Sequence, residues 1–522
     1  MSRSFRREIP LFLAIWLLVG RSFSWADNLK ITIFHTNDIH GWIMSRPSYS
    51  YSPDPQRLIG GAAALSNVVK REKGPKLLLD GGDWFQGTPE GNLSRGQALV
   101  DIFNFMAYDA VAVGNHDFDF GKDRLKELVK AMKVPVLSAN VYRLSDHKRV
   151  DYLKPWIVKD VGGVKVGIFG LLTGNMKNLA FAEDIAGLEF RREVDEAREA
   201  VRTLRRQGAT VIIALTHMGF ESPQLGSFEG DQTFASRVEG IDLIVGGHTH
   251  TFLKEPLHEA THGTLIAQAG TALSHVGKVI LEVDPRTGKV VSSNGGLVDL
   301  WLDQAGEDPA VLEILRPHVQ VVGRVYDVVI ATAAAALLRN REGESALGDW
   351  MTDCSQELNH SDIAIQNSGG IRADMASGPV TVRTIFNIMP FDNYVVNLKM
   401  NGRLVKEVLE HGVGRTKGII QVSGLSFSYN RDKPKGERIS DIFVKGKPLD
   451  LEASYRVSTV DFLVQGGDGY MPFAAAQSKE MTRSLYRDVL RQCAQKHPLI
   501  LPPTGGRMHS LEDPYGDKKY TR

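Results

Sequence analysis

Histidine and aspartate pairs follow two of the apolar runs in this chain. Asp38 and His40 come after a β-branched run, and His248 and His250 end the run IDLIVGGHTH of residues 241–250. In extended backbone, side chains two residues apart point the same way, so each pair is aimed at one spot. Carboxylate and imidazole together suit a borderline or hard divalent cation and exclude a thiolate site. One HxH pair would be a weak indication, and it is the recurrence of the pattern that predicts a metal site.

Three further apolar runs end in the same way. Asp83 stands in DGGDWFQGT, Asn115 in GNHDFDFG, and His217 at the end of the run in VIIALTHMG. Glycines let the backbone turn sharply where a strand leaves a sheet, and the carboxyl edge of the strands is where open α/β sheets place their chemistry. We therefore expect seven ligand candidates to converge: Asp38, His40, Asp83, Asn115, His217, His248 and His250.

Seven candidates exceed what one tetrahedral ion needs. Two divalent ions that share one bridging aspartate would use them all, although the spacing alone does not determine which residue binds which ion. Ions about 3.5 to 4 Å apart can hold a hydroxide and clamp both the attacking and the leaving oxygen of a phosphoryl displacement. Bound metal lowers the pKa of water towards neutrality, so no separate general base is required. The sequence does not distinguish Zn, Mn, Mg and Co.

His116 and Asp119 remain unassigned beside the ligand candidates. A histidine held by a carboxylate can stay cationic, and it can stabilise developing charge or give a proton to a leaving oxygen. The alternative is that Asp119 only caps the helix predicted over residues 122–132. We favour the dyad.

Strand-like and helical runs alternate up to about residue 300, which predicts an α/β fold with an N-terminal layered α/β sandwich. A helix predicted over residues 309–321 carries no ligand cluster, and a second, smaller α/β domain is expected to follow it. The predicted division is a signal peptide over 1–26, the first domain over 27–300, a linker or hinge helix over 301–328, the second domain over 329–510, and a polar tail over 511–522.

The N-terminal segment has the layout of a secretory signal. Three arginines precede the apolar stretch LFLAIWLLVG, and Ser24, Trp25 and Ala26 follow as a cleavage site. Cleavage would place the protein in the periplasm or outside the cell, and the alternative is a retained N-terminal anchor. Cys354 and Cys493 are too few for a disulfide framework and either pair or stay free. The net charge of +1 offers no global field for nucleic acid or an anionic membrane, so we expect neither as a partner.

The motifs DIH, GDWFQGT, GNHDFD, THMG and GGHTH, in this order, resemble those of calcineurin-like metallophosphoesterases, and specifically the secreted 5'-nucleotidase family. Members pair such a domain with a C-terminal nucleotide-binding domain that bears NxGGxR and GGDGY signatures, and both occur here, so the resemblance covers essentially the whole mature chain. It implies that Asn115 also touches phosphate and that His116 and Asp119 form the catalytic dyad. It also implies a partition of the ligands: Asp38, His40, Asp83 and His250 on one ion, and Asp83, Asn115, His217 and His248 on the other.

The resemblance also implies a substrate site in the second domain: Arg341, Asn367 and Arg372 at the substrate, Phe462 stacked on the base, and Asp468 on the ribose hydroxyls. From the residues alone, an arginine after a glycine turn can hold a phosphate bidentately or form a surface ion pair, and a phenylalanine is commonly a core residue. Arg339 is a second candidate for the role of Arg341. Family members usually hold the base between two aromatic residues, and the second position is assigned to Ile419, which would leave the base one aliphatic face.

The predicted activity is hydrolysis of nucleoside 5'-monophosphates by an exported enzyme with two divalent ions, with nucleotide diphosphate sugars and cyclic nucleotides as further candidate substrates. One alternative is a hydrolase of the same superfamily that acts on another ester, such as a sulfur ester. Another is a non-catalytic nucleotide-binding protein. A domain rotation about residues 300–328 is expected to bring the base pocket to the metals. The partner is a small nucleotide, no stable membrane anchor is expected, and the sequence does not indicate the oligomeric state.

Overall fold

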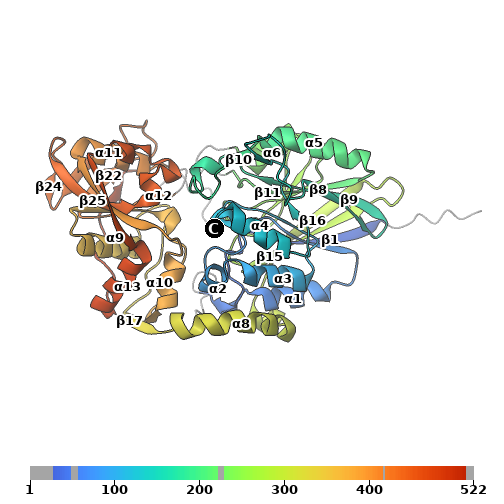
Figure 1. Ribbon diagram of the computed structural model, residues 1–522, viewed down its shortest axis with the longest axis horizontal. Helices are drawn as coiled ribbons and strands as arrows, with labels where there is room; N and C mark the ends of the chain where they lie inside the picture. The colour runs from blue at the N-terminus through green and yellow to red at the C-terminus, as the bar shows by residue number, and fades with distance from the viewer. Residues whose placement is uncertain (1–27, 49–53, 55–56, 222–228, 415–417, 513–522) are drawn as a thin grey trace, which may run out of the picture.

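The computed structural model describes residues 28–48, 54, 57–221, 229–414 and 418–512. They form two α/β domains joined by helix α8 (Pro309–Tyr326), which runs along the base of the first domain and ends at the second (Figure 1). The predicted signal peptide and most of the polar tail lie outside the described residues. Among the residues that are described, no helix combines the length and apolar character needed to cross a membrane.

The first domain contains two six-stranded sheets. The first sheet has the order β16 (Val290–Asp299), β15 (His275–Val283), β1 (Leu29–Thr36), β4 (Lys76–Asp80), β5 (Ala110–Ala112) and β6 (Val136–Leu137). The second has the order β13 (Leu257–His258), β14 (Leu265–Ala267), β12 (Leu243–Val245), β11 (Val211–His217), β9 (Val164–Leu172) and β8 (Trp156–Val161). Strands β1, β4, β5 and β6 of the first sheet run parallel, as do β9, β11, β12 and β14 of the second, so that in each sheet their carboxyl ends share one edge.

The two sheets pack face to face over a core of buried aliphatic side chains that includes Ile33, Val166 and Ile213. Helices cover the outer faces: α1 (Ala62–Arg71), α3 (Gln97–Met106) and α4 (Lys122–Ala131) on the first sheet, and α5 (Glu193–Arg206) and α6 (Asp231–Arg237) on the second. In α5, buried Ala197, Ala200 and Leu204 recur at helical spacing, while acidic residues occupy the first turn and arginines the last. The result is the layered α/β sandwich that the sequence predicts.

The second domain is built on a five-stranded sheet with the order β21 (Ile420–Ser423), β18 (Ile363–Asn367), β25 (Ser454–Val460), β20 (Tyr394–Asn401) and β26 (Ser478–Leu485). Helices α9 (Ala346–Asn359) and α13 (Tyr486–Lys496) pack against each other and are joined by a Cys354–Cys493 disulfide. Of the two states that the sequence left open for these cysteines, the structure therefore has the paired one. A three-stranded sheet and a four-stranded sheet complete the domain: β19 (Gly378–Thr381), β17 (Val329–Ala333) and β27 (Leu499–Ile500), and β24 (Lys447–Pro448), β23 (Ile439–Val444), β22 (Leu425–Tyr429) and β28 (Met508–Ser510).

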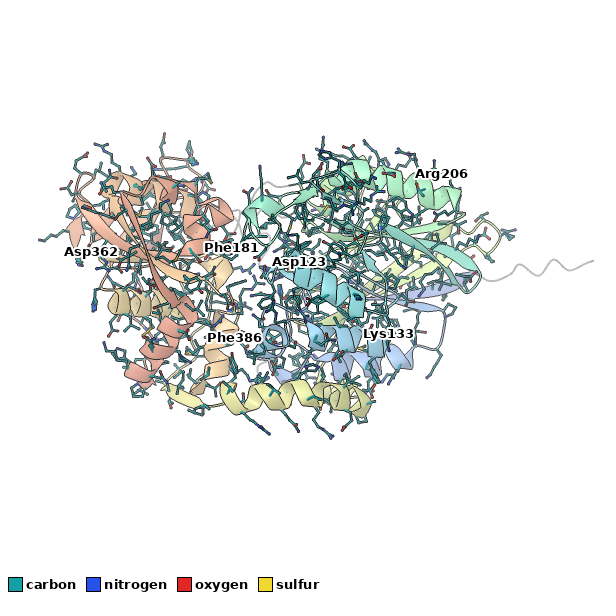
Figure 2. The ribbon with its side chains drawn as sticks, in the orientation of Figure 1. Asp123, Lys133, Phe181, Arg206, Asp362 and Phe386 are labelled. Atoms are coloured by element: carbon teal, nitrogen blue, oxygen red, sulfur yellow. A yellow bond between two sulfur atoms is a disulfide. The ribbon has the colours of Figure 1, made fainter. Side chains whose placement is uncertain are left out.

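Helix α8 links the domains along the chain, and a pair of short helices, one from each domain, is in contact at their boundary. Asp308 caps α8 through the Ala310 N–H, Pro309 occupies its first turn, and the helix continues five residues beyond the predicted end, to Tyr326. At the domain boundary α2 (Pro89–Leu93) contacts α10 (Val382–Ile388). Figure 2 shows side chains filling this boundary, with labelled Phe386 of α10 beside α2.

Candidate active site

The ligand candidates gather where parallel strands of both sheets end. Asp38 and His40 follow β1, Asp83 follows β4, and Asn115 follows β5 in the first sheet. In the second sheet, His217 is the last residue of β11, and His248 and His250 follow β12. The two sheets face each other, so their carboxyl edges bring these side chains to one place, where all are buried or half-buried.

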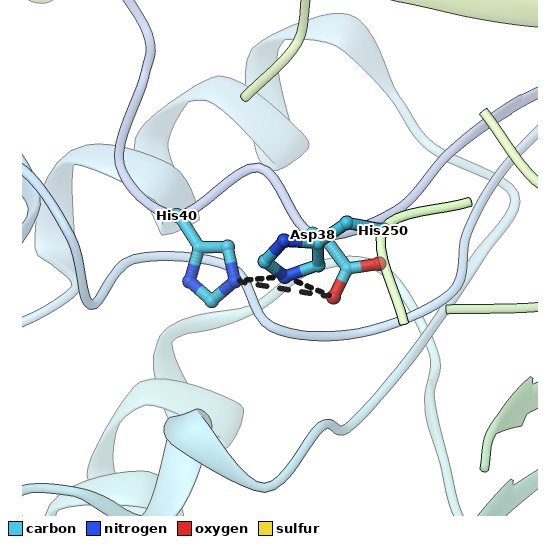
Figure 3. A group of neighbouring side chains, drawn as sticks. All are labelled: Asp38, His40 and His250. Atoms are coloured by element: carbon cyan, nitrogen blue, oxygen red, sulfur yellow. Dashed lines mark hydrogen bonds and ion pairs between the residues drawn. The ribbon is translucent and has the colours of Figure 1, made fainter. Parts of the chain in front are cut away.

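One group within the site consists of Asp38, His40 and His250 (Figure 3). The Oδ1 atom of Asp38 lies 3.9 Å from His40 Nε2 and 3.5 Å from His250 Nε2. The two Nε2 atoms lie 3.0 Å apart. Three potential ligand atoms therefore point at a common position, which is the arrangement that a single cation requires.

A second group consists of Asp38, Asp83 and His217. Asp83 Oδ2 lies 3.1 Å from His217 Nε2 and 3.7 Å from His40 Nε2, so its carboxylate stands between the two groups. Asn115 and His248 lie beside this second group, since the His248 ring packs edge-on against the His217 ring and its Nδ1 lies 2.8 Å from Asn115 Oδ1. All seven ligand candidates are thus brought together.

The backbone at these residues is held in an uncommon conformation. Asp38, His40, Asp83, His248 and His250 all have positive φ, between 50° and 79°. Such a conformation costs about 1–3 kcal/mol for each non-glycine residue and persists where surrounding contacts determine it, often at functional sites. Here two of the turns are hydrogen-bonded to each other. The Asp38 N–H donates to the Gly82 carbonyl at 2.9 Å, and the His40 N–H donates to the Asp83 carbonyl at 3.1 Å.

The histidines are oriented as metal ligands. His217 Nδ1 lies 2.8 Å from the carbonyl of Gly81, and His40 Nδ1 lies 2.7 Å from that of Gln86. A proton on each Nδ1 satisfies these carbonyls and leaves the Nε2 lone pair facing the carboxylates. Burial alone would lower the pKa of His217, but the carboxylate of Asp83, with help from Asp38, raises it to about 10. The buried carboxylate oxygens and the imidazole Nε2 atoms that face them are the kinds of ligand atom that bind a divalent cation.

Asp117 is a residue that the sequence reasoning did not assign. Its carboxylate accepts the N–H groups of Asp83, Trp84 and Gly114, at 3.1, 2.9 and 2.8 Å. It therefore holds the turn that presents Asp83 without touching the ligand cluster itself. The only signal in the sequence is its place after Asn115 and His116 in GNHD.

His116 and Asp119 form a pair at the rim of the cluster. His116 Nδ1 lies 2.8 Å from Asp119 Oδ2, and burial lowers the pKa of His116 less than the carboxylates of Asp119 and Asp83 raise it. Helix α4 begins after Gly121 and has no side-chain cap, so Asp119 does not cap it. The histidine is therefore set up to remain protonated.

A cavity of about 940 Å³ lies between the domains and is lined by four of the ligand candidates, Asp83, Asn115, His248 and His250, and by residues of the second domain. Arg372 reaches across, with Nη2 2.9 Å from His40 Nε2 and 3.4 Å from His250 Nε2. Arg341 also lines the cavity, and burial together with neighbouring arginines lowers its pKa to about 10. Arg339, the second candidate for its role, instead donates to the Arg372 carbonyl and pairs with Asp374 outside the cavity lining.

Asn367, Phe462 and Asp468 line the same cavity. Asn367 Nδ2 donates to Asp468 Oδ2 at 2.6 Å, which orients the carboxylate. Asp468 itself has φ 51° in the glycine-rich turn. The ring of Phe462 lies against Gly467, where a Cβ atom would meet it at 2.5 Å, so the turn needs glycine there.

The position of Ile419 differs from the expectation that its side chain contacts the base. Its side chain is 1% exposed within the core of the second domain and does not line the cavity, because its N–H binds the Arg341 carbonyl and the chain enters β21 with the side chain inward. Phe391 is among the aromatic side chains that do line the cavity, and it packs against the His116 ring at 5.5 Å and lies beneath the Arg372 guanidinium. Phe391 stands in the motif NIMPFDNYVV, and in such a largely apolar motif nothing distinguishes a phenylalanine that lines a cavity from one in the core.

Comparisons with known proteins identify the family of each domain. The calcineurin-like phosphoesterase family matches residues 31–252, and the 5'-nucleotidase C-terminal domain family matches residues 321–475. Snake venom 5'-nucleotidase from Naja atra is 30% identical over 92% of this chain and 98% of its own length. The crystal structure of a 5'-nucleotidase precursor from Thermus thermophilus has a TM-score of 0.85 at 30% identity, over 93% of this chain and 100% of its own. Sulfate thiohydrolase SoxB from Thermus thermophilus shares the fold, with a TM-score of 0.78 at 18% identity, over 93% of this chain and 97% of its own.

Proposed function

This chain belongs to the 5'-nucleotidase family of calcineurin-like phosphoesterases and is a hydrolase of that type, and we propose that it converts nucleoside 5'-monophosphates to nucleoside and phosphate. The observation that carries the proposal is the contact of Arg372 with His40. It means that a guanidinium suited to phosphate and the buried ligand cluster face one cavity, so a phosphate held by one meets the other.

Two divalent cations fit the seven ligand candidates. We assign Asp38, His40, Asp83 and His250 to one, and Asp83, Asn115, His217 and His248 to the other, because Asp83 Oδ2 lies 3.1 Å from His217 Nε2 and 3.7 Å from His40 Nε2, whereas Asp38 Oδ1 lies 3.5 Å from His250 Nε2 and 4.0 Å from His217 Nε2. When bound, such a pair supplies an activated water and neutralises charge on the phosphate.

The protein's own side chains perform the remaining steps. Arg372 and Arg341 bind and orient the phosphate, and Asn115 contacts one of its oxygens. A water oxygen bonds to phosphorus as the bond from phosphorus to the nucleoside 5' oxygen breaks. His116, held by Asp119, gives its Nε2 proton to that leaving oxygen. The attacking water keeps one proton on the phosphate product and releases the other to solvent, from which His116 is protonated again. The nucleoside and inorganic phosphate then leave.

The nucleoside is bound by the second domain. Phe462, whose ring lies against Gly467 in the cavity wall, offers an aromatic face to the base, and Phe391, which lines the cavity beside His116 and Arg372, is a second aromatic side chain within the same cavity. Asp468, oriented by Asn367, accepts hydrogen bonds from the ribose hydroxyls. Substrate entry and product release require the domains to separate, and we assign the hinge to the segment around residues 300–328.

Export is a further part of the proposal. The N-terminal segment has the layout of a secretory signal, and the Cys354–Cys493 disulfide is of the kind that persists in oxidising compartments. Expression of the full chain should give a periplasmic or extracellular protein that begins near Asp27. Retention of the segment in purified protein, shown by intact mass, would contradict this.

Phosphate release tests the activity. Purified protein is assayed with AMP, UMP, UDP-glucose and cyclic AMP, with and without a chelator and re-added divalent ions. Metal-dependent release from AMP and UMP supports the proposal. A sulfate ester is assayed in parallel by sulfate release, and turnover of this ester alone would support the alternative hydrolase, whereas nucleotide binding without turnover of any ester would support a binding protein.

A further inference from the structure

The backbone of Asp468 is held in an uncommon conformation within a glycine-rich turn. Its φ of 51° is in the left-handed region, and Gly466 and Gly469 of the same turn have φ 93° and 79°. An aspartate persists in this region where surrounding contacts hold it. Because the Cα–Cβ bond turns with the backbone, the contacts of the Asp468 backbone decide where its carboxylate points.

Two backbone hydrogen bonds brace this turn from within. The Gly469 N–H donates to the Gly466 carbonyl at 3.0 Å, and the Tyr470 N–H donates to the Gly467 carbonyl at 3.1 Å. Both bonds join residues before Asp468 to residues after it, and neither uses the Asp468 carbonyl. Since three of the four residues at 466–469 are glycine, which has wide conformational freedom, the turn also needs support from outside.

His411 supplies that support. Its Nε2 atom lies 3.0 Å from the carbonyl oxygen of Asp468. Burial lowers the pKa of His411, so the ring is neutral near pH 7 and carries one proton. A carbonyl only accepts hydrogen bonds, so this proton lies on Nε2 and His411 is the donor.

The His411 ring is itself fixed in place. It stands in the last turn of α11 (Gly402–Gly412), a helix whose Val408 is buried in the core of the second domain. The ring packs edge-on against the buried ring of Tyr470, with centroids 4.4 Å apart. A Cβ atom on Gly469 would lie 3.1 Å from His411 Cε1, so the imidazole lies directly against the turn.

We propose that His411 is a positioning residue that holds Asp468 in its left-handed conformation and thereby sets the preference for nucleosides that carry ribose hydroxyls. The inference rests on the proposed function, because it takes the Asp468 carboxylate as the acceptor for these hydroxyls. Both residues line the cavity, and Asn367 holds the carboxylate from the other end, at 2.6 Å. An acceptor held in this way binds the ribose without the cost of ordering a loop.

Two replacements of His411 test the proposal. His411→Phe keeps an aromatic ring against Tyr470 but has no N–H donor. His411→Gln places an amide nitrogen the same number of bonds from Cα as the imidazole Nε2, so it restores the donor without the ring. The pair therefore separates the hydrogen bond from the packing.

Calorimetry with adenosine and with 2',3'-dideoxyadenosine, which lacks both ribose hydroxyls, separates ribose binding from base binding. For His411→Phe we expect the Kd for adenosine to rise about tenfold and the Kd for dideoxyadenosine to stay within about twofold. For His411→Gln the Kd for adenosine should stay within about threefold of wild type. An equal rise for both nucleosides in His411→Phe, or equally weak adenosine binding by both variants, would overturn the proposal.

An Asp468→Ala background shows whether His411 acts through Asp468. There, His411→Phe should change the Kd for adenosine by less than about twofold, because the carboxylate that it positions is gone. A full loss of affinity on top of Asp468→Ala would overturn the proposal. If His411→Phe does not fold, His411→Met takes its place, since an unbranched apolar side chain adapts to the same space and lacks the donor.

Adenosine binding needs no turnover, so it decides the inference even if wild-type protein fails to hydrolyse AMP and the proposed function falls. Hydrolysis of AMP by wild type, together with unchanged adenosine affinity in His411→Phe, would overturn the inference and leave the proposed function standing. Wild-type protein that binds adenosine no better than dideoxyadenosine would also overturn the inference.

Discussion

Glu90 and Arg383 form an ion pair that joins the two domains, since Glu90 lies in α2 of the first and Arg383 in α10 of the second. Arg383 also binds Asp327, which ends the connecting helix α8, at 2.6 Å. One guanidinium therefore ties both domains to the segment that links them. Glu90 is 5% exposed, so the pair is largely desolvated.

Loss of this guanidinium should favour separation of the domains. Arg383→Ala leaves the buried Glu90 carboxylate without this partner, and hydration of Glu90 then requires the boundary to open. We expect small-angle scattering of the ligand-free variant to give a larger radius of gyration than wild type. The KM for AMP should rise about tenfold, which corresponds to about 1.4 kcal/mol.

Arg403→Ala is the matched control for this change. Arg403 pairs with Glu452 at the surface, within the second domain, and both side chains are well exposed. Its removal should change neither the scattering curve nor the KM. Superimposable curves for wild type and Arg383→Ala would show that the pair does not hold the domains together.

Asp83 is the residue on which the two-cation assignment depends. Its Oδ2 atom lies within 3.7 Å of ligand atoms in both groups, so Asp83→Asn removes the charge that both cations would share. We expect kcat to fall by at least about 10³-fold, a loss of roughly 4 kcal/mol in transition-state stabilisation. We also expect added Mn²⁺ or Zn²⁺ to raise the Tm of wild-type protein, and this rise should shrink or vanish in the variant.

Asp54→Asn changes the same residue type at an exposed position of the first domain and serves as the control. It should retain both the activity and the metal-dependent rise in Tm. An Asp83→Asn variant that keeps wild-type turnover would refute the bridging role.

The positions of the ligand candidates follow from sequence, whereas those of the residues proposed to bind the base do not follow completely. The strands that lead to Asp38, Asp83 and His217 are recognisable because the apolar run and the polar residues at its end are local patterns. The inward orientation of Ile419 depends on how β21 pairs with β18, which chain order does not show. Asp117 was missed for a similar reason, since its carboxylate binds only backbone N–H groups, which carry no residue signature.

Truncation of Phe391 and truncation of Ile419 should have opposite effects on the KM for AMP and on stability. Phe391→Ala should raise the KM for AMP by about tenfold or more, because one base-stacking face is worth about 1–3 kcal/mol, and should leave the KM for phenyl phosphate far less changed. Ile419→Ala should lower the stability of the second domain by about 2–5 kcal/mol, the usual cost of such a core truncation. Its KM for AMP should stay near that of wild type at temperatures where it is folded.

Steady-state kinetics with both substrates, together with urea unfolding, measure these effects. The two variants serve as controls for each other, since each removes an apolar side chain from the second domain. A larger rise in the KM for AMP with Ile419→Ala than with Phe391→Ala would return the base contact to Ile419.

The buried carboxyl group of Asp231 should make the stability of the folded protein depend on pH. Its side chain is buried beneath the turn that carries His248 and His250, and it accepts a hydrogen bond from Thr216 Oγ1 at 2.7 Å. It packs so closely against Gly246 that a Cβ atom on this glycine would lie 2.1 Å from the carboxylate. Burial raises the pKa of this carboxyl from 3.8 to about 8. Between these values the folded protein holds a proton that the unfolded chain has lost, so stability falls as pH rises through this window and levels off above about pH 8.

Asp231→Asn removes this contribution, because the amide is neutral at every pH and keeps an acceptor for Thr216. Relative to wild type, the variant should gain up to about 1.4 kcal/mol of stability for each pH unit between pH 5 and pH 7. Calorimetric Tm values in chelator-containing buffer measure the difference without contributions from bound metal. Asp303→Asn is the control, because its exposed carboxylate has a lowered pKa and is ionised in both states over this range. Parallel Tm profiles for Asp231→Asn and wild type would mean that the Asp231 carboxyl is already ionised in the folded protein.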